Sequence, residues 1–592
     1  MPVDTLLHHF ASGHRAIMVT GRSLWDLHLD DQGQVRPLRH TLFRHARERH
    51  QMAALGFNLA QGAVWELVGQ PPQERRRIEA DLRAVGIDIA LLAGDQAGGR
   101  LPHERALALL SAIHTAAITR ESIPPLLLVL DFTEHLAPNA SAQATDFTLQ
   151  LTEMLWILAH EVRLRRHSLF IVFCGCRDLV ATGVTSTLPE IRLQQPDKAE
   201  KLPFIAALRA SELRQAAVFE PGLDDDAVAA LSAHTPNRSL EQLCYGSSRT
   251  GQAITRDQLV DRKRDDIVAM SDGTLRLLDT GRVAMSRLNG RCINHVVGIL
   301  TGWSARLRAG DTRMPMNILL AGAPSTGKTD VALSLARLAG VPALEMASPK
   351  GSFVGETERR SKLQWRVFKE LAPAMGFVDE VTETWGLRRG GMNLDSGASD
   401  AMQGAMLEAL SDSSRAGRTL LVATTNCPWR LGAAQESRWA CLPVLAALPE
   451  DYPDIVAGIA STVEPSMAWS PDDPLIIAAA DVFVEKALPP RGIRSALTVE
   501  ASLAPGVLTP GRVLNAARAA LPPSQKARLS AEYADLAAIA RCSSRTFLPW
   551  FADPQGYPFP ACLRGIVDAS TGEVDGDALD ARLHLLADQI DV

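Results

Sequence analysis

Residues 316–329 read Met-Asn-Ile-Leu-Leu-Ala-Gly-Ala-Pro-Ser-Thr-Gly-Lys-Thr. The first six residues have the apolar character of a buried strand, and the last eight match the phosphate-loop pattern GxxxxGK[ST]. A helical pattern follows at once over residues 330–338. Strand, glycine-rich loop and helix in this order are the context that the motif requires, so the sequence predicts a phosphate-binding loop here.

Each part of this loop suits a bound phosphate. Gly322 and Gly327 allow the backbone angles of a loop that wraps an anion. The loop N–H groups and the helix N-terminus direct positive partial charge at it. Lys328 can reach the β- and γ-phosphates, and the Thr329 hydroxyl can bind Mg²⁺. The predicted ATP-binding residues are Gly322, Ala323, Pro324, Ser325, Thr326, Gly327, Lys328, Thr329 and Asp330.

An acidic pair follows a second apolar strand. Residues 374–378 are apolar and lead into Asp379 and Glu380. Beside the phosphate loop, Asp379 can hold Mg²⁺ through its water shell, and Glu380 can act as the general base for the attacking water. The alternative is a pair of carboxylates that cap the next helix. The phosphate loop upstream favours the catalytic interpretation.

A third apolar strand, residues 419–424, ends at Thr425 and Asn426. If this strand adjoins the other two, the Asn426 amide can orient the lytic water or contact the γ-phosphate. Without such neighbours it is an ordinary asparagine at a strand end.

Composition describes a large globular protein. The 592 residues carry 61 Lys+Arg and 67 Asp+Glu, a net charge of −6, and are 46% hydrophobic and 22% charged. This length predicts about four domains. The weak acidity argues against a protein that coats nucleic acid by bulk charge and leaves a local basic groove open.

The sequence also bears on location. No apolar run approaches the roughly 18–20 residues of a membrane helix, and residues 1–4 do not begin a secretion signal. The 8 cysteines are scattered, as reduced thiols would be in a cytoplasmic protein, and Cys174-Gly175-Cys176 alone has close spacing, with no second pair to complete a metal site. We therefore expect a cytoplasmic protein that does not span a membrane.

The fold class follows from alternating apolar runs and helical patterns, which indicate parallel sheets covered by helices. Four strands are expected in the first 220 or so residues: 16–20, 87–92, 126–130 and 169–173. The sequence predicts an α/β protein with two P-loop-type α/β/α sandwich cores, each followed by a small helical subdomain. The predicted parts are a degenerate RecA- or AAA-like domain (1–222), a helical subdomain and linker (223–312), the ATPase core (313–450), a helical lid (451–529) and a C-terminal extension (530–592).

The first core lacks the nucleotide motifs of the second. Gly21-Arg22-Ser23 follows its first strand without a GK[ST] sequence, and Asp131 is followed by Phe132 where a catalytic Glu would stand. Asp131 is then a surviving Mg²⁺ ligand or, as the sequence favours, a helix cap. We expect this domain to neither bind nor hydrolyse ATP, and to serve assembly or partner docking. The mixed charges of residues 261–266 predict the solvated face of a linking helix.

The order of motifs over about residues 313–521 resembles the AAA family of ring-forming ATPases. The residues that carry the likeness are the phosphate loop, Phe353-Val354-Gly355-Glu356, Asp379-Glu380, Thr424-Thr425-Asn426 and Arg438. The resemblance implies hydrolysis of ATP with Mg²⁺ by a homo-oligomer, a hexameric ring. It makes Arg438 an arginine finger that acts on ATP held by a neighbouring subunit, although Ser437-Arg438-Trp439-Ala440 departs from the usual Arg-Arg-Phe-Asp or Gly-Arg-Phe-Asp.

The same resemblance extends to two further residues. Arg512, which follows Thr509-Pro510-Gly511 at the start of a helix, matches a position in the lid that can touch the γ-phosphate, and the alternative is a solvent-facing charge. Phe353 matches a pore-loop aromatic that grips a polypeptide client, and the alternative is packing in its own core. The domain order is similar to a little-characterised AAA family known from a hypothetical chloroplast reading frame, with bacterial relatives, in which an N-terminal RecA-like domain has lost its phosphate loop.

Three functions remain open from the sequence. The first is a ring ATPase that remodels or threads a protein client through the Phe353 loop. The second is an ATP-switched scaffold in a signalling or defence complex, and the third is a motor on DNA. The aromatic residues 547–551 are a further open feature, either a docking site or a cluster that packs against the lid.

Overall fold

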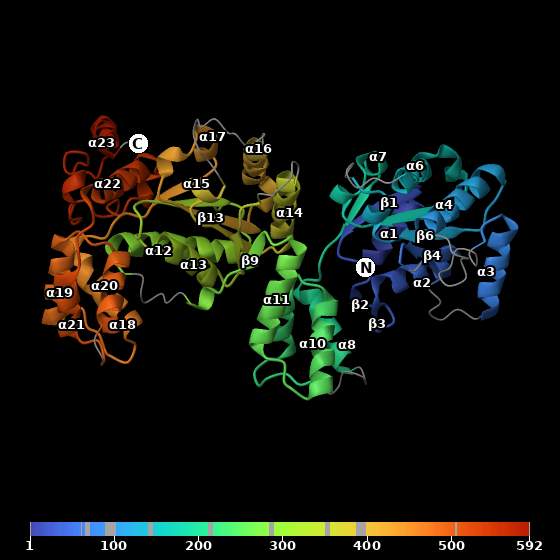
Figure 1. Cartoon of the computed structure of the whole chain (residues 1–592), viewed down its shortest axis with the longest axis horizontal. Helices are drawn as coiled ribbons and strands as arrows, with labels where there is room; N and C mark the ends of the chain where they lie inside the picture. The colour runs from blue at the N-terminus through green and yellow to red at the C-terminus, as the bar shows by residue number, and fades with distance from the viewer. Residues whose placement is uncertain are drawn as a thin grey trace. The chain divides into compact units, whose positions relative to one another are not determined.

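The computed structural model describes residues 2–60, 62–65, 72–88, 102–139, 146–210, 217–282, 289–349, 356–385, 398–503 and 506–590. The chain divides into two compact units, Met1–Asp266 and Ile267–Val592. Each unit contains its own six-stranded sheet (Figure 1). The α/β class with two sandwich cores is confirmed.

The first unit has the strand order β5-β4-β6-β7-β1-β8, and all neighbours are parallel except β4 and β5. Its core strands are continuously apolar because helices cover both faces. One face packs on α1 (Pro2–Ala11) and α2 (Leu38–His50), and the other on α4 (Pro102–Thr119) and α6 (Asp146–His160). The strands are β1 (Ala16–Gly21), β4 (Ala53–Asn58), β5 (Gly62–Trp65), β6 (Leu126–Leu130), β7 (Leu169–Cys174) and β8 (Glu190–Leu193).

Three of the four strands expected in this unit are confirmed, and most of the fourth, 87–92, lies outside the described residues. Ile87 and Asp88 follow helix α3 (Pro72–Ala84) in a non-strand segment, and residues 89–92 lie outside the described part of the chain. The strand next to β6 is β4, whose six residues are all buried. Its sequence, AALGFN, contains two alanines and a glycine, so it lacks the β-branched enrichment that marks a strand.

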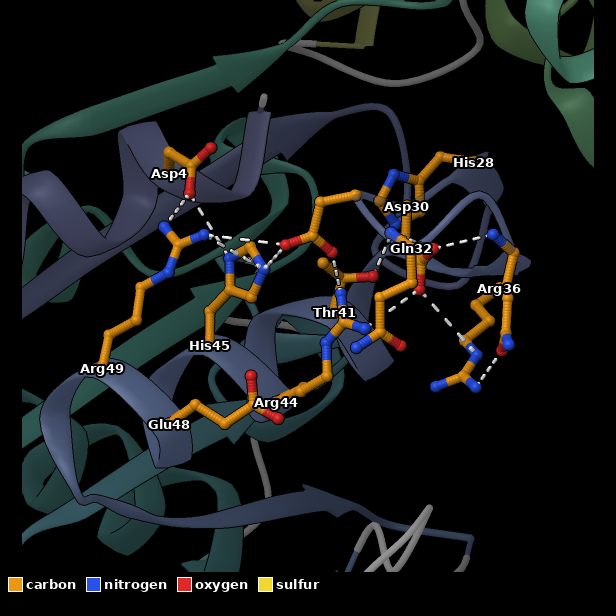
Figure 2. A network of polar contacts seen from close by, with 12 residues as sticks. Asp4, His28, Asp30, Gln32, Arg36, Thr41, Arg44, His45, Glu48 and Arg49 are labelled. Carbon is orange, nitrogen blue, oxygen red and sulfur yellow. Dashed lines mark hydrogen bonds and ion pairs between the residues drawn. The ribbon is translucent and has the colours of Figure 1, made fainter.

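A polar network joins α1, α2 and the hairpin of β2 (Leu27–Leu29) and β3 (Val35–Pro37) (Figure 2). His45 on α2 lies between two carboxylates, with Nδ1 3.3 Å from Asp4 Oδ1 and Nε2 3.1 Å from Asp31 Oδ2. Burial lowers the pKa of His28 to about 4, so His28 is neutral at pH 7, and its Nε2 lies 2.7 Å from Thr41 Oγ1. These contacts fix the segment that occupies the place of a phosphate loop in this unit.

Helices around a separate apolar cluster complete the first unit. They are α8 (Lys198–Ala210), α9 (Asp225–Ser232), α10 (Asn237–Thr250) and the first part of α11 (Arg256–Met270). The charged run 261–266 lies in α11, as expected, but it is not wholly solvated. Lys263 is buried and Asp266 accepts a hydrogen bond from Ser239 Oγ at 2.8 Å. The mixed-charge pattern concealed this inward side because lysine can bury its aliphatic stem.

The second unit has the strand order β14-β10-β13-β12-β11-β9, parallel except for the pair β9 and β11. One face packs on α12 (Arg291–Arg308) and α13 (Lys328–Ala339), and the other on α14 (Glu356–Glu370) and α16 (Ala398–Ser411) (Figure 1). The strands are β9 (Leu275–Leu277), β10 (Asn317–Ala321), β11 (Ala343–Met346), β12 (Ala374–Val378), β13 (Thr419–Thr425) and β14 (Ala440–Pro443).

The remaining helices form two groups, which we name the lid and the C-terminal extension after the parts predicted from the sequence. The lid core is built by α18 (Tyr452–Val463), α19 (Pro474–Glu485), α20 (Pro490–Leu503) and α21 (Pro510–Ala519). Helix α22 (Gln525–Ala540) crosses the predicted boundary at residue 530; it packs with α23 (Gly576–Ile590), and we count both helices in the extension. Of the aromatic residues in 547–551, Trp550 is 1% exposed inside this extension and Phe547 packs against Trp303 of α12, whereas Phe551 is 51% exposed. The cluster therefore packs against the extension and α12, and the predicted packing against the lid is wrong.

The five parallel strands of the two sheets share one topology. Read from the β8 and β14 edges, they follow the same chain order, but the antiparallel edge strands are connected differently: β5 directly follows β4 in the chain, whereas β9 precedes β10. In both, the strand that precedes the acidic motif is followed by a non-glycine residue with positive φ, Phe132 (54°) and Glu380 (47°). Each of these residues is the N-cap of a four-residue helix, α5 (Thr133–Leu136) or α15 (Val381–Thr384). The first unit therefore repeats the architecture of the second without its nucleotide motifs.

Candidate functional site

The predicted motifs meet at the carboxyl-terminal ends of three adjacent strands of the second sheet. Strands β10, β13 and β12 are parallel neighbours, so the segments that follow them meet at their shared carboxyl end. There Thr329 Oγ1, at the start of α13, donates to Asp379 Oδ1 at 3.3 Å. The structure thus brings the phosphate loop and the acidic pair to the same side of the sheet.

The phosphate loop has the backbone conformation that its glycines allow. Gly322, Ser325 and Gly327 all have positive φ, of 153°, 68° and 86°. A Cβ on Gly322 would collide with the Val444 carbonyl oxygen, so only glycine fits at that position. Gly327 is the N-cap of α13, which places the helix N-terminus at the loop.

Lys328 is the buried cation of the site. Its ammonium group donates to the carbonyl oxygens of Gly322 at 3.1 Å and Ala323 at 2.6 Å. Burial lowers the pKa of Lys328 to about 8, although Glu380 and other nearby carboxylates oppose that shift. A phosphate oxygen would supply the counter-charge that raises this pKa again.

Thr424 links the acidic pair. Its hydroxyl donates to Asp379 Oδ1 at 2.6 Å, and its oxygen accepts the Glu380 backbone N–H at 3.0 Å. Thr424 is fully buried, so these bonds are shielded from water. Sequence reasoning assigned no role to this residue, although its place in the Thr-Thr-Asn end of β13 was the available signal.

Asn426 holds the carboxylate of Glu380. The backbone N–H of Asn426 donates to Glu380 Oε2 at 3.0 Å, and its side-chain amide donates to Oε1. The Glu380 side chain therefore faces β13 and makes no capping bond to α15, which argues against the helix-cap alternative. Desolvation raises the pKa of Glu380, as suits a general base.

The donor set fits Mg²⁺. The Thr329 hydroxyl and the Asp379 carboxylate offer hard oxygen ligands, and they lie 3.3 Å apart beside a loop that binds phosphate. The buried Oδ1 of Asn426 has no hydrogen-bond partner among the described residues and is a further polar atom at this edge. A bound Mg²⁺ would supply charge neutralisation to the phosphates.

Arg438 lies away from these residues. It precedes β14, its Nε donates to Ser411 Oγ at 2.8 Å, and its carbonyl accepts from the amide of Asn317, the first residue of β10. The phosphate loop follows the other end of β10, about 13–16 Å away for a strand of this length. Arg438 is partly exposed and lies at the amino-terminal end of β10 and β14, whereas the phosphate loop follows the carboxyl-terminal end of β10.

Arg512 contacts its own lid. Its Nε lies 3.2 Å from Glu500 Oε1, and its Nη1 donates to the Gly506 carbonyl at 3.0 Å. The structure does not bring Arg512 to the phosphate loop through any contact between described residues. Phe353 and the rest of 351–355 lie outside the described residues, so the pore-loop prediction has no structural counterpart here.

With this geometry in place, comparison with known proteins gives a clear result. Residues 318–441 match the AAA family. The family is described as the "ATPase family associated with various cellular activities", and the matched segment runs from β10 to β14. We call residues 318–441 the AAA segment.

Part of the chain is similar to two curated proteins. "ATP-dependent zinc metalloprotease FtsH 3" of Conexibacter woesei is 33% identical over 147 residues, which are 24% of this chain and 19% of that protein. "Cell division cycle protein 48 homolog" of Archaeoglobus fulgidus is 30% identical over 123 residues, 20% of this chain and 16% of that protein. The chain thus spans less than a fifth of the length of these relatives. The match to a family of ATPases supports an ATP-hydrolysing enzyme.

The corresponding edge of the first unit has different chemistry. Arg39, the second residue of α2, pairs with Asp131 through Nη1 and Oδ2 at 2.7 Å, and both side chains are buried. Neither interpretation of Asp131 as a Mg²⁺ ligand or as a helix cap included this partner. The Arg39 guanidinium therefore pairs with Asp131, the carboxylate that corresponds to Asp379 in the second unit.

A cavity of about 550 Å³ opens beside this pair. Phe132, at the place of Glu380, is 51% exposed at its rim, and Trp25 stacks on Arg39 with 3.9 Å from the guanidinium carbon to the ring centre. The described lining residues are Ser23, Trp25, Asn58, Leu59, Ala60, Phe132, His135 and Arg238. Apolar walls and an internal ion pair replace the groups that would bind a phosphate.

Among the described residues, none of the groupings of three or more His, Cys, Asp or Glu is arranged to hold a metal ion, Cys174 and Cys176 included. None of the described helices is both long enough and apolar enough to cross a membrane.

Proposed function

We propose that the AAA segment binds ATP with Mg²⁺ and hydrolyses it, in the context of a homo-oligomeric ring that remodels a protein client. The observation that carries the proposal is the 3.3 Å contact between Thr329 and Asp379, beside the buried Lys328. It joins the two motifs that phosphoryl transfer requires.

The residues divide the work of hydrolysis. The loop N–H groups and Lys328 hold the phosphates and offset the negative charge that develops on them. Thr329 and Asp379 would hold the magnesium. Glu380 takes a proton from the attacking water, after its carboxylate leaves the amide of Asn426 that holds it in this structure.

The ring and its client are the finer part of the proposal. The position of Arg438 supports an assembly. It lies at the amino-terminal end of β10, and its own phosphate loop follows the other end of that strand, so it can act only on another subunit's nucleotide. A hexamer and a client gripped by Phe353 follow from the AAA resemblance. The net charge of −6 gives no support to nucleic acid as the partner.

Two variants test the chemistry. Glu380→Gln should bind ATP with wild-type affinity and lose at least about a hundredfold in turnover, since it removes the base and keeps the loop. Lys328→Ala should bind ATP at least about a hundredfold more weakly, since it removes a charge-assisted contact to phosphate. The matched control is Glu383→Gln, which changes a nearby carboxylate that pairs with Arg430 outside the site. Wild-type turnover in Glu380→Gln would refute the assignment of the base.

Phe353→Ala separates the proposed activity from its alternatives. Loss of protein remodelling with intact ATPase activity supports threading of a client. Full retention of cellular function would favour an ATP-switched scaffold, and stimulation of turnover by DNA rather than by unfolded protein would favour a motor on DNA.

A further inference from the structure

Helix α22 of the C-terminal extension reaches the phosphate loop with one carboxylate. Asp535 Oδ1 accepts the backbone N–H of Ala323 at 2.8 Å, and Oδ2 accepts the backbone N–H of Ala446 at 2.9 Å. Ala323 is the second residue of the loop, and Ala446 lies in the segment that follows β14. A single side chain therefore bridges the start of the phosphate loop and the end of the neighbouring strand.

The bridge occurs where the loop has least freedom. The Gly322 φ of 153° turns the chain out of β10, and an added Cβ there would collide with Val444 O and lie 3.3 Å from Asp535 Oδ1. The same turn presents the carbonyl oxygens of Gly322 and Ala323 to the Lys328 ammonium. The orientation of these two peptides thus depends on Asp535 on one side and on Lys328 on the other.

Helix α22 is firmly seated on the core. Ala538 packs in the apolar cluster that contains Leu319 and Ala321 of β10, and Leu536 packs with Leu445 after β14. Tyr533 meets Trp429 edge-on, with ring centres 4.7 Å apart. The helix can therefore hold Asp535 in a fixed position relative to the loop.

The surroundings of Asp535 explain why its two bonds matter. Solvent reaches part of the residue, but protein atoms crowd its carboxylate, and this burial raises its pKa to about 6. A desolvated carboxylate is unfavourable unless hydrogen bonds satisfy it, and here two backbone donors do so.

We propose that Asp535 is a positioning residue for the phosphate loop, so that the C-terminal extension sets nucleotide affinity. The inference rests on the proposed ATPase function, because it assigns a residue outside the AAA segment to the same site. Asp535 contacts the loop backbone and takes no part in bond breaking.

The test compares Asp535→Asn with Glu532→Gln in the full chain. Asparagine keeps the shape but offers one acceptor oxygen in place of two, so one of the two N–H groups is left without its bond. Glu532 lies on the same helix, and its Oε1 accepts from Arg582 Nε at 3.0 Å, away from the loop. Its replacement perturbs the extension without touching Ala323 or Ala446.

Three measurements are made on each variant: the dissociation constant for a fluorescent ATP analogue, kcat at saturating ATP, and hydrogen exchange of residues 322–327. For Asp535→Asn we expect a dissociation constant about tenfold higher, equal to about 1.4 kcal/mol, with kcat within about twofold of wild type, and faster exchange in the loop. For Glu532→Gln we expect wild-type affinity and wild-type exchange.

Equal weakening of affinity in the two variants would show a general effect of the extension and overturn the proposal, as would unchanged affinity in Asp535→Asn. If the wild-type chain binds no ATP, the proposed function fails, and loop exchange then decides alone. Faster exchange in Asp535→Asn would keep the positioning role, and unchanged exchange would remove it.

Discussion

At the scale of single residues, Lys328 shows how burial prepares a charge for its ligand. Its ammonium group is enclosed by the loop, and its pKa of about 8 lies below the ordinary value of 10.5. The positive charge is therefore only partly present in the free protein above pH 8, and phosphate restores it.

This predicts pH-dependent binding of ATP. Above pH 8 the free lysine loses its proton and the bound lysine keeps it, so binding takes up a proton. The association constant should fall as the pH rises above about 8, by up to about tenfold per pH unit. Calorimetry in two buffers of different ionisation enthalpy measures the proton uptake directly. A binding constant that does not change over this range would contradict the prediction, and Lys328→Met is the control, with weak binding that does not vary with pH.

Thr424 is the second residue whose role is local. Thr424→Val removes the bond to Asp379 and the acceptor for the Glu380 N–H, and valine keeps the volume of the buried side chain. A hydrogen bond to a charged group contributes about 1.5–3 kcal/mol, so kcat should fall by about 10- to 150-fold. Steady-state ATPase kinetics measure this.

The matched control is Thr382→Val. It removes another buried hydroxyl, 3.2 Å from Thr425 Oγ1, without touching either carboxylate. We expect it to keep kcat within about twofold of wild type. An equal loss in both variants would mean that the fall reflects general damage to the strand ends.

At the scale of elements, the sequence predicted the strands with the strongest patterns. β10, β12 and β13 were found because each is apolar throughout and ends in a polar motif, and these three place Lys328 and Asp379. β4 was missed because Ala-Ala-Leu-Gly-Phe-Asn has a weak strand composition, and only its position between β5 and β6 makes it one. The local composition of β4 does not favour a strand, but its pairing with neighbouring strands buries it and makes it one.

The site was predictable where chemistry stands in a contiguous motif. The contact of Asp535 with Ala323 joins residues more than two hundred positions apart, and no local pattern marks it. The partner of Asp131 was hidden for the same reason, because Arg39 lies in an ordinary helical segment. Tertiary packing alone creates such pairs.

The junction between the first sheet and its helical part gives a stability prediction. Asp26 pairs with Arg22 through Oδ2 and Nε at 2.6 Å, with both side chains buried, and accepts the N–H of Arg238 at the start of α10 at 2.9 Å. Asp26→Ala leaves a buried guanidinium without its partner and uncaps the helix. The first unit should lose about 3–5 kcal/mol of unfolding free energy.

Denaturant titration followed by hydrogen exchange of α10 peptides measures this loss. The control is Asp225→Ala, which breaks an exposed pair with Arg209 and should change stability by less than about 1 kcal/mol. ATP binding should remain at the wild-type level in both. A loss in Asp26→Ala no larger than that of the control would contradict the prediction.

At the scale of the whole molecule, the position of Arg438 predicts complementation between subunits. Arg438→Ala and Glu380→Gln should each be inactive, but their defects would fall on opposite sides of a shared interface. In a random one-to-one mixture about a quarter of the interfaces would pair an intact base with an intact arginine. Turnover of the mixture should therefore rise to about a quarter of wild type.

The control mixture combines Glu380→Gln with Lys328→Ala. Both defects lie on the nucleotide side of the interface, so mixing creates no complete site and activity should stay absent. An equally inactive mixture of Arg438→Ala and Glu380→Gln would show that Arg438 does not serve a neighbour's nucleotide.

The Arg39–Asp131 pair has a consequence for the working cycle. A metal ion can leave with spent nucleotide, but an arginine is tethered by the backbone and stays. The carboxyl edge of the N-terminal sheet should therefore hold one electrostatic state from the start of a turnover to its end. Residues 1–266 would then keep the same charge distribution throughout the cycle, and the changes in charge that accompany ATP binding and hydrolysis would be confined to residues 267–592.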